Sequence, residues 1–124
     1  MAEIQNPKRY DLEDRTKLFA AEVRRFIKVI PKNLQNNEDG KQLIRSSGSV
    51  GANYIEANES VSKKDFILRL KISRKEAKET LYWLGLIDPG LEKSPSAQRD
   101  ALTKECTEIM KIVGAILHKS ESPF

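Results

Sequence analysis

The chain has 124 residues, of which 39% are hydrophobic and 32% are charged, and its formal net charge is +4. A chain of this length fits one domain with a sizeable core, and its composition is not that of a disordered or low-complexity protein. It contains no apolar run of about 18 residues and no signal-peptide pattern, so we expect a cytoplasmic protein without a membrane span. The single cysteine agrees with a reducing compartment, and the modest positive charge permits an acidic partner without requiring one.

Four helical patterns follow one another along the chain. The first is predicted at about residues 11–30, where Asp11 can cap the helix and Pro31 ends it. Its apolar positions recur in steps of three and four residues, which is the spacing of one buried helix face. This face comprises Leu12, Thr16, Phe19, Val23, Phe26 and Ile30.

The second helix is predicted at about residues 37–57, with Asn36 or Asn37 as its N-cap and a left-handed Asn58 after its end. It contains the run RSSGSVGAN, whose serines and glycines favour a loop by propensity. Small and apolar positions nevertheless recur at helical spacing, at Leu43, Ser47, Val50, Tyr54 and Ala57. Because such small side chains let a neighbouring helix approach closely, we interpret the run as a buried, tightly packed helix.

The third helix is predicted at about residues 62–87. Ser62 can cap it by accepting a hydrogen bond from the Asp65 amide, and the turn sequence of residues 88–90 ends it. Its buried face is predicted to comprise Phe66, Leu70, Ser73, Ala77, Thr80 and Leu84.

The fourth helix is predicted at about residues 95–119, with Ser94 or Ser96 at its start. Its buried face is predicted to comprise Leu102, Cys106, Ile109, Val113 and Ile116. Four helices of similar length joined by short connectors predict an all-α protein with a single domain, residues 1–124, folded as an antiparallel up-down-up-down four-helix bundle.

The third helix carries two further stripes. One is apolar and comprises Leu68, Ile72 and Trp83; it either widens the contact with the core or forms an interface between copies of the chain. The other is basic and comprises Lys64, Lys71, Arg74, Lys75 and Lys78. Bases also repeat on the first helix at Lys17, Arg24 and Lys28, and on the fourth at Lys104, Lys111 and His118. These basic stripes are either a solvated outer face or a surface for a phosphate backbone.

The sequence carries no catalytic, cofactor or metal pattern that we can identify. His118 is the only histidine, and Cys106 lies on a buried face, where a small hydrophobic role is expected. Patterns for EF-hand, P-loop, dinucleotide, zinc and di-iron sites are absent, as are those of base-reading nucleic-acid modules. We therefore expect no enzyme, no cofactor and no metal, with a site assembled between subunits as the alternative.

The segment from Leu43 to Leu84 carries a family resemblance. Its matching positions are Arg45, Ser46, Ser47, Gly48, Ser49, Ala52, Asn53, Glu56, Ser62, Asp65 and Phe66. This pattern resembles the four-helix-bundle proteins encoded by intervening sequences of bacterial 23S rRNA genes, and it departs from them at Asn58, usually Gly, and Gly51, commonly Pro. The resemblance implies a homopentamer of up-down bundles without enzymatic activity. A more distant resemblance is to the accessory variability determinant of diversity-generating retroelements, which works beside a reverse transcriptase and binds nucleic acid.

Asn53 and Glu56 are polar residues of the second helix that follow the family pattern. We interpret them either as a contact between subunits, with Arg45 or a base of the next copy, or as local caps of the turn between the second and third helices. The sequence as a whole predicts a homo-oligomer that serves as a basic scaffold for RNA, DNA or a nucleic-acid enzyme. The alternative is a purely structural or protein-adaptor oligomer with no affinity for nucleic acid.

Overall fold

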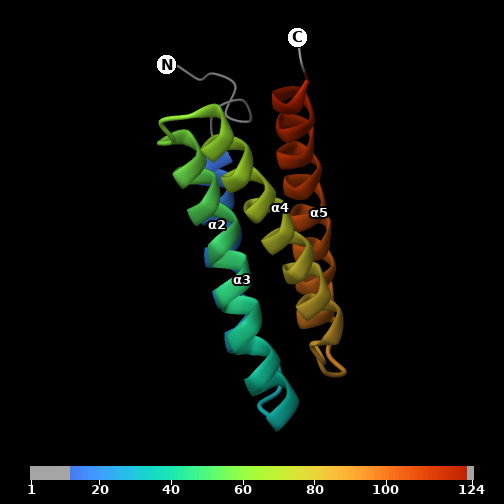
Figure 1. The fold of residues 1–124 in the computed structure, drawn as a ribbon. Helices are drawn as coiled ribbons and strands as arrows, with labels where there is room; N and C mark the ends of the chain where they lie inside the picture. Colours follow the sequence, from blue (N-terminus) through green and yellow to red (C-terminus); the bar gives the residue numbers. More distant parts are fainter. Residues whose placement is uncertain (1–11, 123–124) are drawn as a thin grey trace, which may run out of the picture.

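The computed structural model describes residues 12–122, and within this range the chain forms four helices and no strand. They are α2 (Leu12–Val29), α3 (Leu34–Asn58), α4 (Lys63–Leu86) and α5 (Lys93–Glu121), as Figure 1 shows. The predicted all-α class with four helices is confirmed. None of the helices in residues 12–122 is both long enough and apolar enough to cross a membrane.

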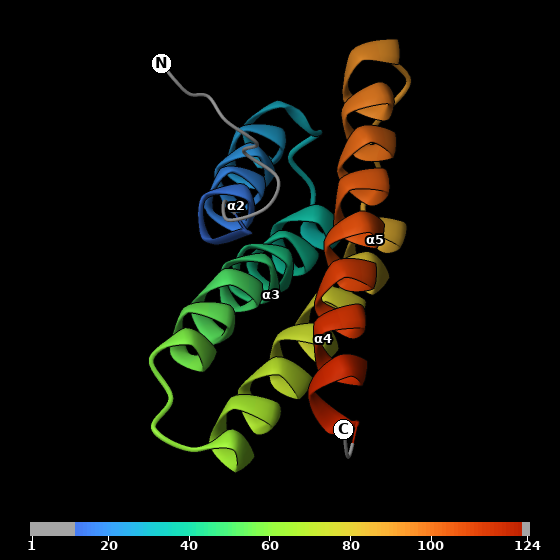
Figure 2. The same cartoon turned by 90° about the horizontal axis from the view of Figure 1, so that it is seen from above.

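The helices pack as a bundle in which each contacts its neighbour in the chain (Figures 1 and 2). The contact between α3 and α4 is the most extensive, and α2 closes the bundle by packing on α5. The α2 and α3 helices meet near both of their ends. Asn58 at the end of α3 donates a hydrogen bond of 2.8 Å to Glu13 at the start of α2, whereas Gly40 near the start of α3 faces Ile27 near the end of α2.

The predicted buried faces of all four helices form one core. Every residue predicted for the first face is buried, and so are Leu43, Leu70 and Ile109 on the other three helices. Three of the predicted positions, Tyr54, Phe66 and Ile116, are only partly buried but still pack against this core. Leu117, which the sequence analysis did not include, is fully buried in α5.

The serine- and glycine-rich run is helical and closely packed, which confirms the interpretation of that segment. Ser73 on α4 donates a hydrogen bond of 2.8 Å to the main-chain carbonyl of Val50, so the two helix backbones lie close together. The Thr80 hydroxyl lies 2.9 Å from Ser46 Oγ, and both residues are fully buried. On the side that faces α2, a Cβ atom at Gly51 would lie only 2.6 Å from Thr16 Oγ1. The small residues therefore permit close contact with two helices.

Three predictions about the ends of α3 were wrong. The N-cap is Asn33, which accepts a hydrogen bond of 2.8 Å from the Asn36 amide, so the helix begins three residues earlier than predicted and neither Asn36 nor Asn37 caps it. Asn58 does not adopt a left-handed conformation, because in residues 12–122 only Gly90 has a positive φ, of 85°. The carbonyls at the end of α3 instead accept hydrogen bonds from the amides of the next residues in the turn.

The predicted cap of α4 is confirmed, whereas the predicted caps of α5 are wrong. Ser62 accepts the predicted hydrogen bond from the Asp65 amide at 3.1 Å, which confirms this cap. The α5 helix begins at Lys93 after Glu92, whose side chain makes no capping bond, so the predicted caps Ser94 and Ser96 were wrong. Pro95 is tolerated inside the first turn because amides there have no partner within the helix. The predicted cap of α2, Asp11, lies outside the described residues.

Candidate functional site

The only cysteine of the chain is not a reactive group. Cys106 is buried, its thiol donates a hydrogen bond of 3.3 Å to the Ala77 carbonyl, and burial raises its pKa to about 12. The thiol is therefore protonated at neutral pH, and a protonated thiol is a poor nucleophile and metal ligand. In residues 12–122, no group of three or more His, Cys, Asp and Glu side chains is placed to hold a metal ion. The remaining candidate from the sequence is the basic surface of the helices.

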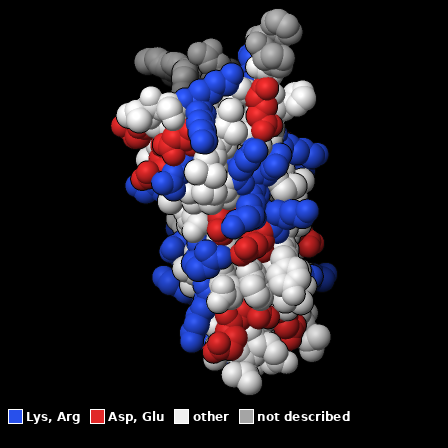
Figure 3. Space-filling view, in the orientation of Figure 1, with Lys and Arg blue, Asp and Glu red and all other residues white. Residues whose placement is uncertain are grey.

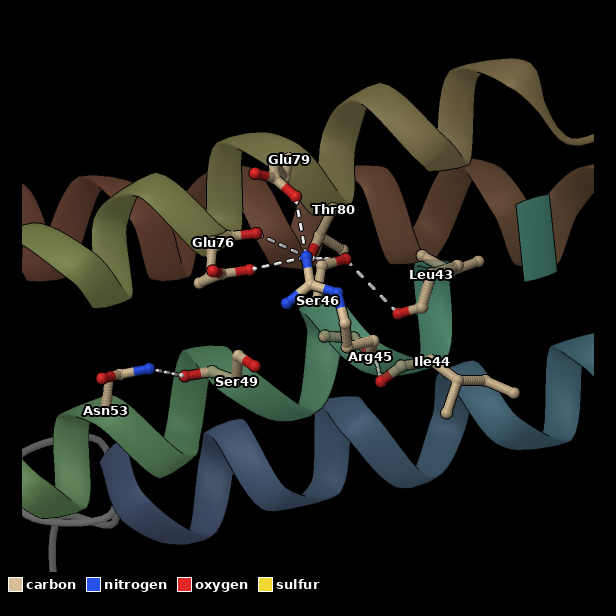
Figure 4. Close-up of polar contacts among 10 residues, drawn as sticks. Leu43, Ile44, Arg45, Ser46, Ser49, Asn53, Glu76, Glu79 and Thr80 are labelled. Atoms are coloured by element: carbon tan, nitrogen blue, oxygen red, sulfur yellow. Dashed lines mark hydrogen bonds and ion pairs between the residues drawn. The ribbon is translucent and has the colours of Figure 1, made fainter. Parts of the chain in front are cut away.

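Several basic side chains are neutralised by carboxylates of the same chain. Arg15 on α2 makes a bidentate pair with Glu105 on α5, at 2.7 and 2.8 Å, and this hydrogen bonding raises the pKa of Arg15. Arg45 on α3 lies between two glutamates of α4, 3.3 Å from Glu76 and 2.9 Å from Glu79 (Figure 4). Glu76 is buried, so the pair with Arg45 compensates its charge. These bases join helices and are not free to hold a phosphate.

The bases predicted on the third helix are different, because most have no ion-pair partner in the described part of the chain. Within the described residues, none of four exposed side chains of α4 forms an ion pair; they are Lys64, Arg74, Lys75 and Lys78. Lys71 pairs with Glu121 of α5 at 3.3 Å, but both side chains are about half exposed and the pair is open to solvent. Figure 3 shows more basic than acidic side chains over the region of α4 and α5.

Bases of α5 extend this surface, whereas those of α2 lie elsewhere. The stem of Arg74 runs over Gly114, where a Cβ atom would lie 3.8 Å from it, and Gly114 is one turn from the exposed Lys111. Lys104 and His118, the other predicted bases of α5, are exposed as well. Arg24 instead lies beside Gly48 on the α3 side of α2, and its guanidinium donates to the Ala20 carbonyl at 2.9 Å. The other predicted bases of α2, Lys17 and Lys28, are exposed.

The predicted apolar stripe of α4 divides into exposed and packed residues. Leu68 is 51% exposed, and Ile72 is partly exposed. Trp83, in contrast, packs against the core, which agrees with the alternative interpretation for that residue. The sequence analysis missed Tyr82 and Leu86, which are 61% and 49% exposed. Leu86 lies 18 residues from Leu68, which is about five whole helical turns, so this spacing could have indicated it. Tyr82, 14 residues from Leu68, lies about 40° from it around the helix, toward the basic stripe.

Comparison with known proteins identifies the family. Residues 8–115 match the family model of the 23S rRNA-intervening sequence protein. The chain belongs to this family. The chain is similar to a protein of unknown function from the S23 ribosomal protein family, from Bacteroides thetaiotaomicron, whose crystal structure is known. The two sequences are 34% identical, and the structures superpose with a TM-score of 0.70. The match covers 86% of this chain and 97% of that one. No curated protein matches the chain.

The family-pattern residues Asn53 and Glu56 have different surroundings in the structure. Asn53 donates a hydrogen bond of 2.9 Å to the Ser49 carbonyl (Figure 4). Its side-chain oxygen, Oδ1, accepts a hydrogen bond of 3.5 Å from Arg69 of α4. The exposed carboxylate of Glu56 forms no ion pair within the described part of the chain, and Arg45 is engaged with α4 instead. Neither side chain caps the turn after α3, where the Ser60 hydroxyl bonds the Glu56 carbonyl at 3.1 Å.

Proposed function

We propose that this protein is a non-enzymatic, antiparallel up-down-up-down bundle that assembles as a homo-oligomer and binds nucleic acid non-specifically. The observation that carries the proposal is the contrast between paired and unpaired bases. Arg15 and Arg45 are held by carboxylates of the same chain. Among residues 12–122, in contrast, four exposed bases of α4 have no ion-pair partner; they are Lys64, Arg74, Lys75 and Lys78. A surface of free bases can neutralise phosphates and release their counterions.

The antiparallel order is supported by contacts along three helix pairs. Thr16 lies near Gly51 and Ile27 near Gly40, so the residue numbers of α2 rise as those of α3 fall. The α3 and α4 helices follow the same rule, because Val50 bonds Ser73 and Ser46 bonds Thr80. The α4 and α5 helices follow it too, with Lys71 near Glu121 and the Ile87 carbonyl bonded to Arg99.

Assembly is supported by the apolar side chains that α4 leaves in water. Leu68 and Ile72 extend beyond the core face of the helix, and their burial against a second copy would remove apolar area from solvent. The family resemblance implies five copies. In light scattering, we expect the wild type to have a molecular mass several times the 14.1 kDa of one chain. The double variant Leu68→Glu with Ile72→Glu is expected to have the mass of a single chain. Val61→Glu is the control, because Val61 is 98% exposed in a loop. A wild type at 14.1 kDa, or a double variant that assembles normally, would contradict the proposal.

Nucleic-acid binding is tested by reversing two charges on α4. Lys75→Glu with Lys78→Glu is expected to abolish retention of RNA or DNA at low salt, because two cations on the basic surface become anions. The control, Lys41→Glu with Lys93→Glu, makes the same change in net charge at exposed lysines of other regions. Wild-type binding should fall steeply with added salt and depend little on base sequence. Equal loss in both double variants, or binding that is flat with salt, would count against the α4 surface.

The alternative function is a structural or adaptor oligomer without affinity for nucleic acid. The ratio of absorbance at 260 and 280 nm separates the two functions. Protein purified at low salt should carry nucleic acid and have a raised ratio, and a high-salt wash should return the ratio to that of protein alone. A ratio that is the same under both conditions would favour the adaptor function.

A further inference from the structure

An exposed aromatic ring continues the line of lysines on α4. Lys71, Lys75, Lys78 and Tyr82 follow one another in steps of four, three and four residues, so they lie along a single stripe of the helix. At 1.5 Å per residue the stripe is about 16 Å long. Tyr82 is 61% exposed, although an aromatic ring of this size normally gains from burial. The end of the lysine stripe is therefore an aromatic surface open to solvent.

The Tyr82 ring contacts Trp83 and is otherwise largely exposed. Tyr82 makes an edge-to-face contact with Trp83, with ring centres 5.0 Å apart and planes at 78°, and Trp83 packs against the core. One turn further along, Gly85 adds no side chain to this surface, and a Cβ atom there would meet no atom of the described residues within 4 Å. The exposed part of the Tyr82 ring is therefore accessible to a flat group from solvent.

We propose that this stripe binds single-stranded nucleic acid, with Lys75 and Lys78 contacting phosphates and Tyr82 stacking on an unpaired base. The inference rests on the proposed function and specifies its ligand. A basic track with an aromatic side chain is how single strands are held without sequence preference, because every base offers a flat face. In a duplex each base is already stacked on its neighbours, so the ring would gain nothing there. An exposed lysine stripe alone would not distinguish the two forms.

The test compares a labelled oligothymidine of about 12 nucleotides with a duplex of the same length, by fluorescence anisotropy at about 50 mM salt. Tyr82→Ala is expected to weaken single-strand binding by about tenfold, the value of one stacked base. Duplex binding should not change. Tyr82→Phe should bind as the wild type does, because it keeps the ring. The salt dependence should be the same in Tyr82→Ala as in the wild type, because no charge is lost.

Three other outcomes would overturn the inference, and they can be told apart. If Tyr82→Ala binds the single strand as tightly as the wild type, or loses single strand and duplex equally, the stacking site is wrong while the proposed function stands. If the wild type binds neither form at low salt, the proposed function fails with it. If light scattering shows that Tyr82→Ala no longer assembles, Tyr82 is a contact between subunits, and that also overturns the inference. Leu91→Ala is the control for loss of an exposed apolar side chain, because Leu91 is fully exposed in the loop after α4 and lies outside this stripe.

Discussion

Replacing Gly51 with valine is expected to lower the free energy of unfolding by about 3 kcal/mol, the upper part of the usual range for overfilling a packed core. A Cβ atom at this position would lie 2.6 Å from Thr16 Oγ1 and 3.0 Å from Thr16 Cβ. Thr16 cannot easily move aside, because it is buried and its hydroxyl bonds the Leu12 carbonyl at 2.8 Å. The α2 and α3 helices would have to separate. Urea unfolding at one fixed protein concentration measures the loss.

Gly85→Ala is the matched control for this prediction. Gly85 is also a helical glycine, but a Cβ atom there would meet nothing within 4 Å. The substitution should therefore raise the free energy of unfolding by about 0.5–1 kcal/mol, because alanine favours the helix. If Gly51→Val were as stable as the wild type, the close approach of α2 and α3 would be contradicted.

Changing Asn36 to aspartate is expected to cost about 3 kcal/mol, the upper limit for leaving a buried polar group without its partner. The Asn36 side chain is buried, and its Nδ2 donates to the carbonyls of Pro31 and Asp88 at 3.0 and 2.8 Å. Its Oδ1 accepts from the Asp88 amide at 3.0 Å. An aspartate at position 36 could still accept the hydrogen bond from the Asp88 amide. Its second oxygen, however, would face the two carbonyl oxygens to which Nδ2 now donates. Thermal unfolding followed by circular dichroism measures the loss.

Asn37→Asp is the control, since Asn37 is the exposed neighbour in the same first turn. It should leave the midpoint of unfolding close to that of the wild type. Similar midpoints for the two aspartate variants would show that Asn36 does not join the α2–α3 connection to the α4–α5 connection.

Periodicity predicted the helices and most of the core. Residues such as Phe19, Val23 and Leu70 recur at the spacing of a helix, and burial follows from that spacing alone. It also predicted that the run around Ser47 and Val50 is helical, although propensity favoured a loop, because contacts with neighbouring helices outweigh propensity at small residues.

What the sequence did not reveal were contacts between residues far apart in the chain. Asn36 looks like an N-cap, but its side chain bonds Asp88, 52 residues away, and Asn33 takes the cap. The basic stripe of α4 was recognisable from spacing, whereas the pairing of Lys71 with Glu121 depends on how α4 and α5 meet. Which bases are free can be known only after the helices are packed.

The most direct test of the account is amide hydrogen exchange across α3. If the serines and glycines serve close packing, the amides from Ser46 to Ala57 should exchange only through global unfolding, as slowly as those around Leu70 and Ile109. If the amides of residues 46–57 exchanged within seconds while the other helices stayed protected, this segment would be open, and the close packing of α3 would be contradicted.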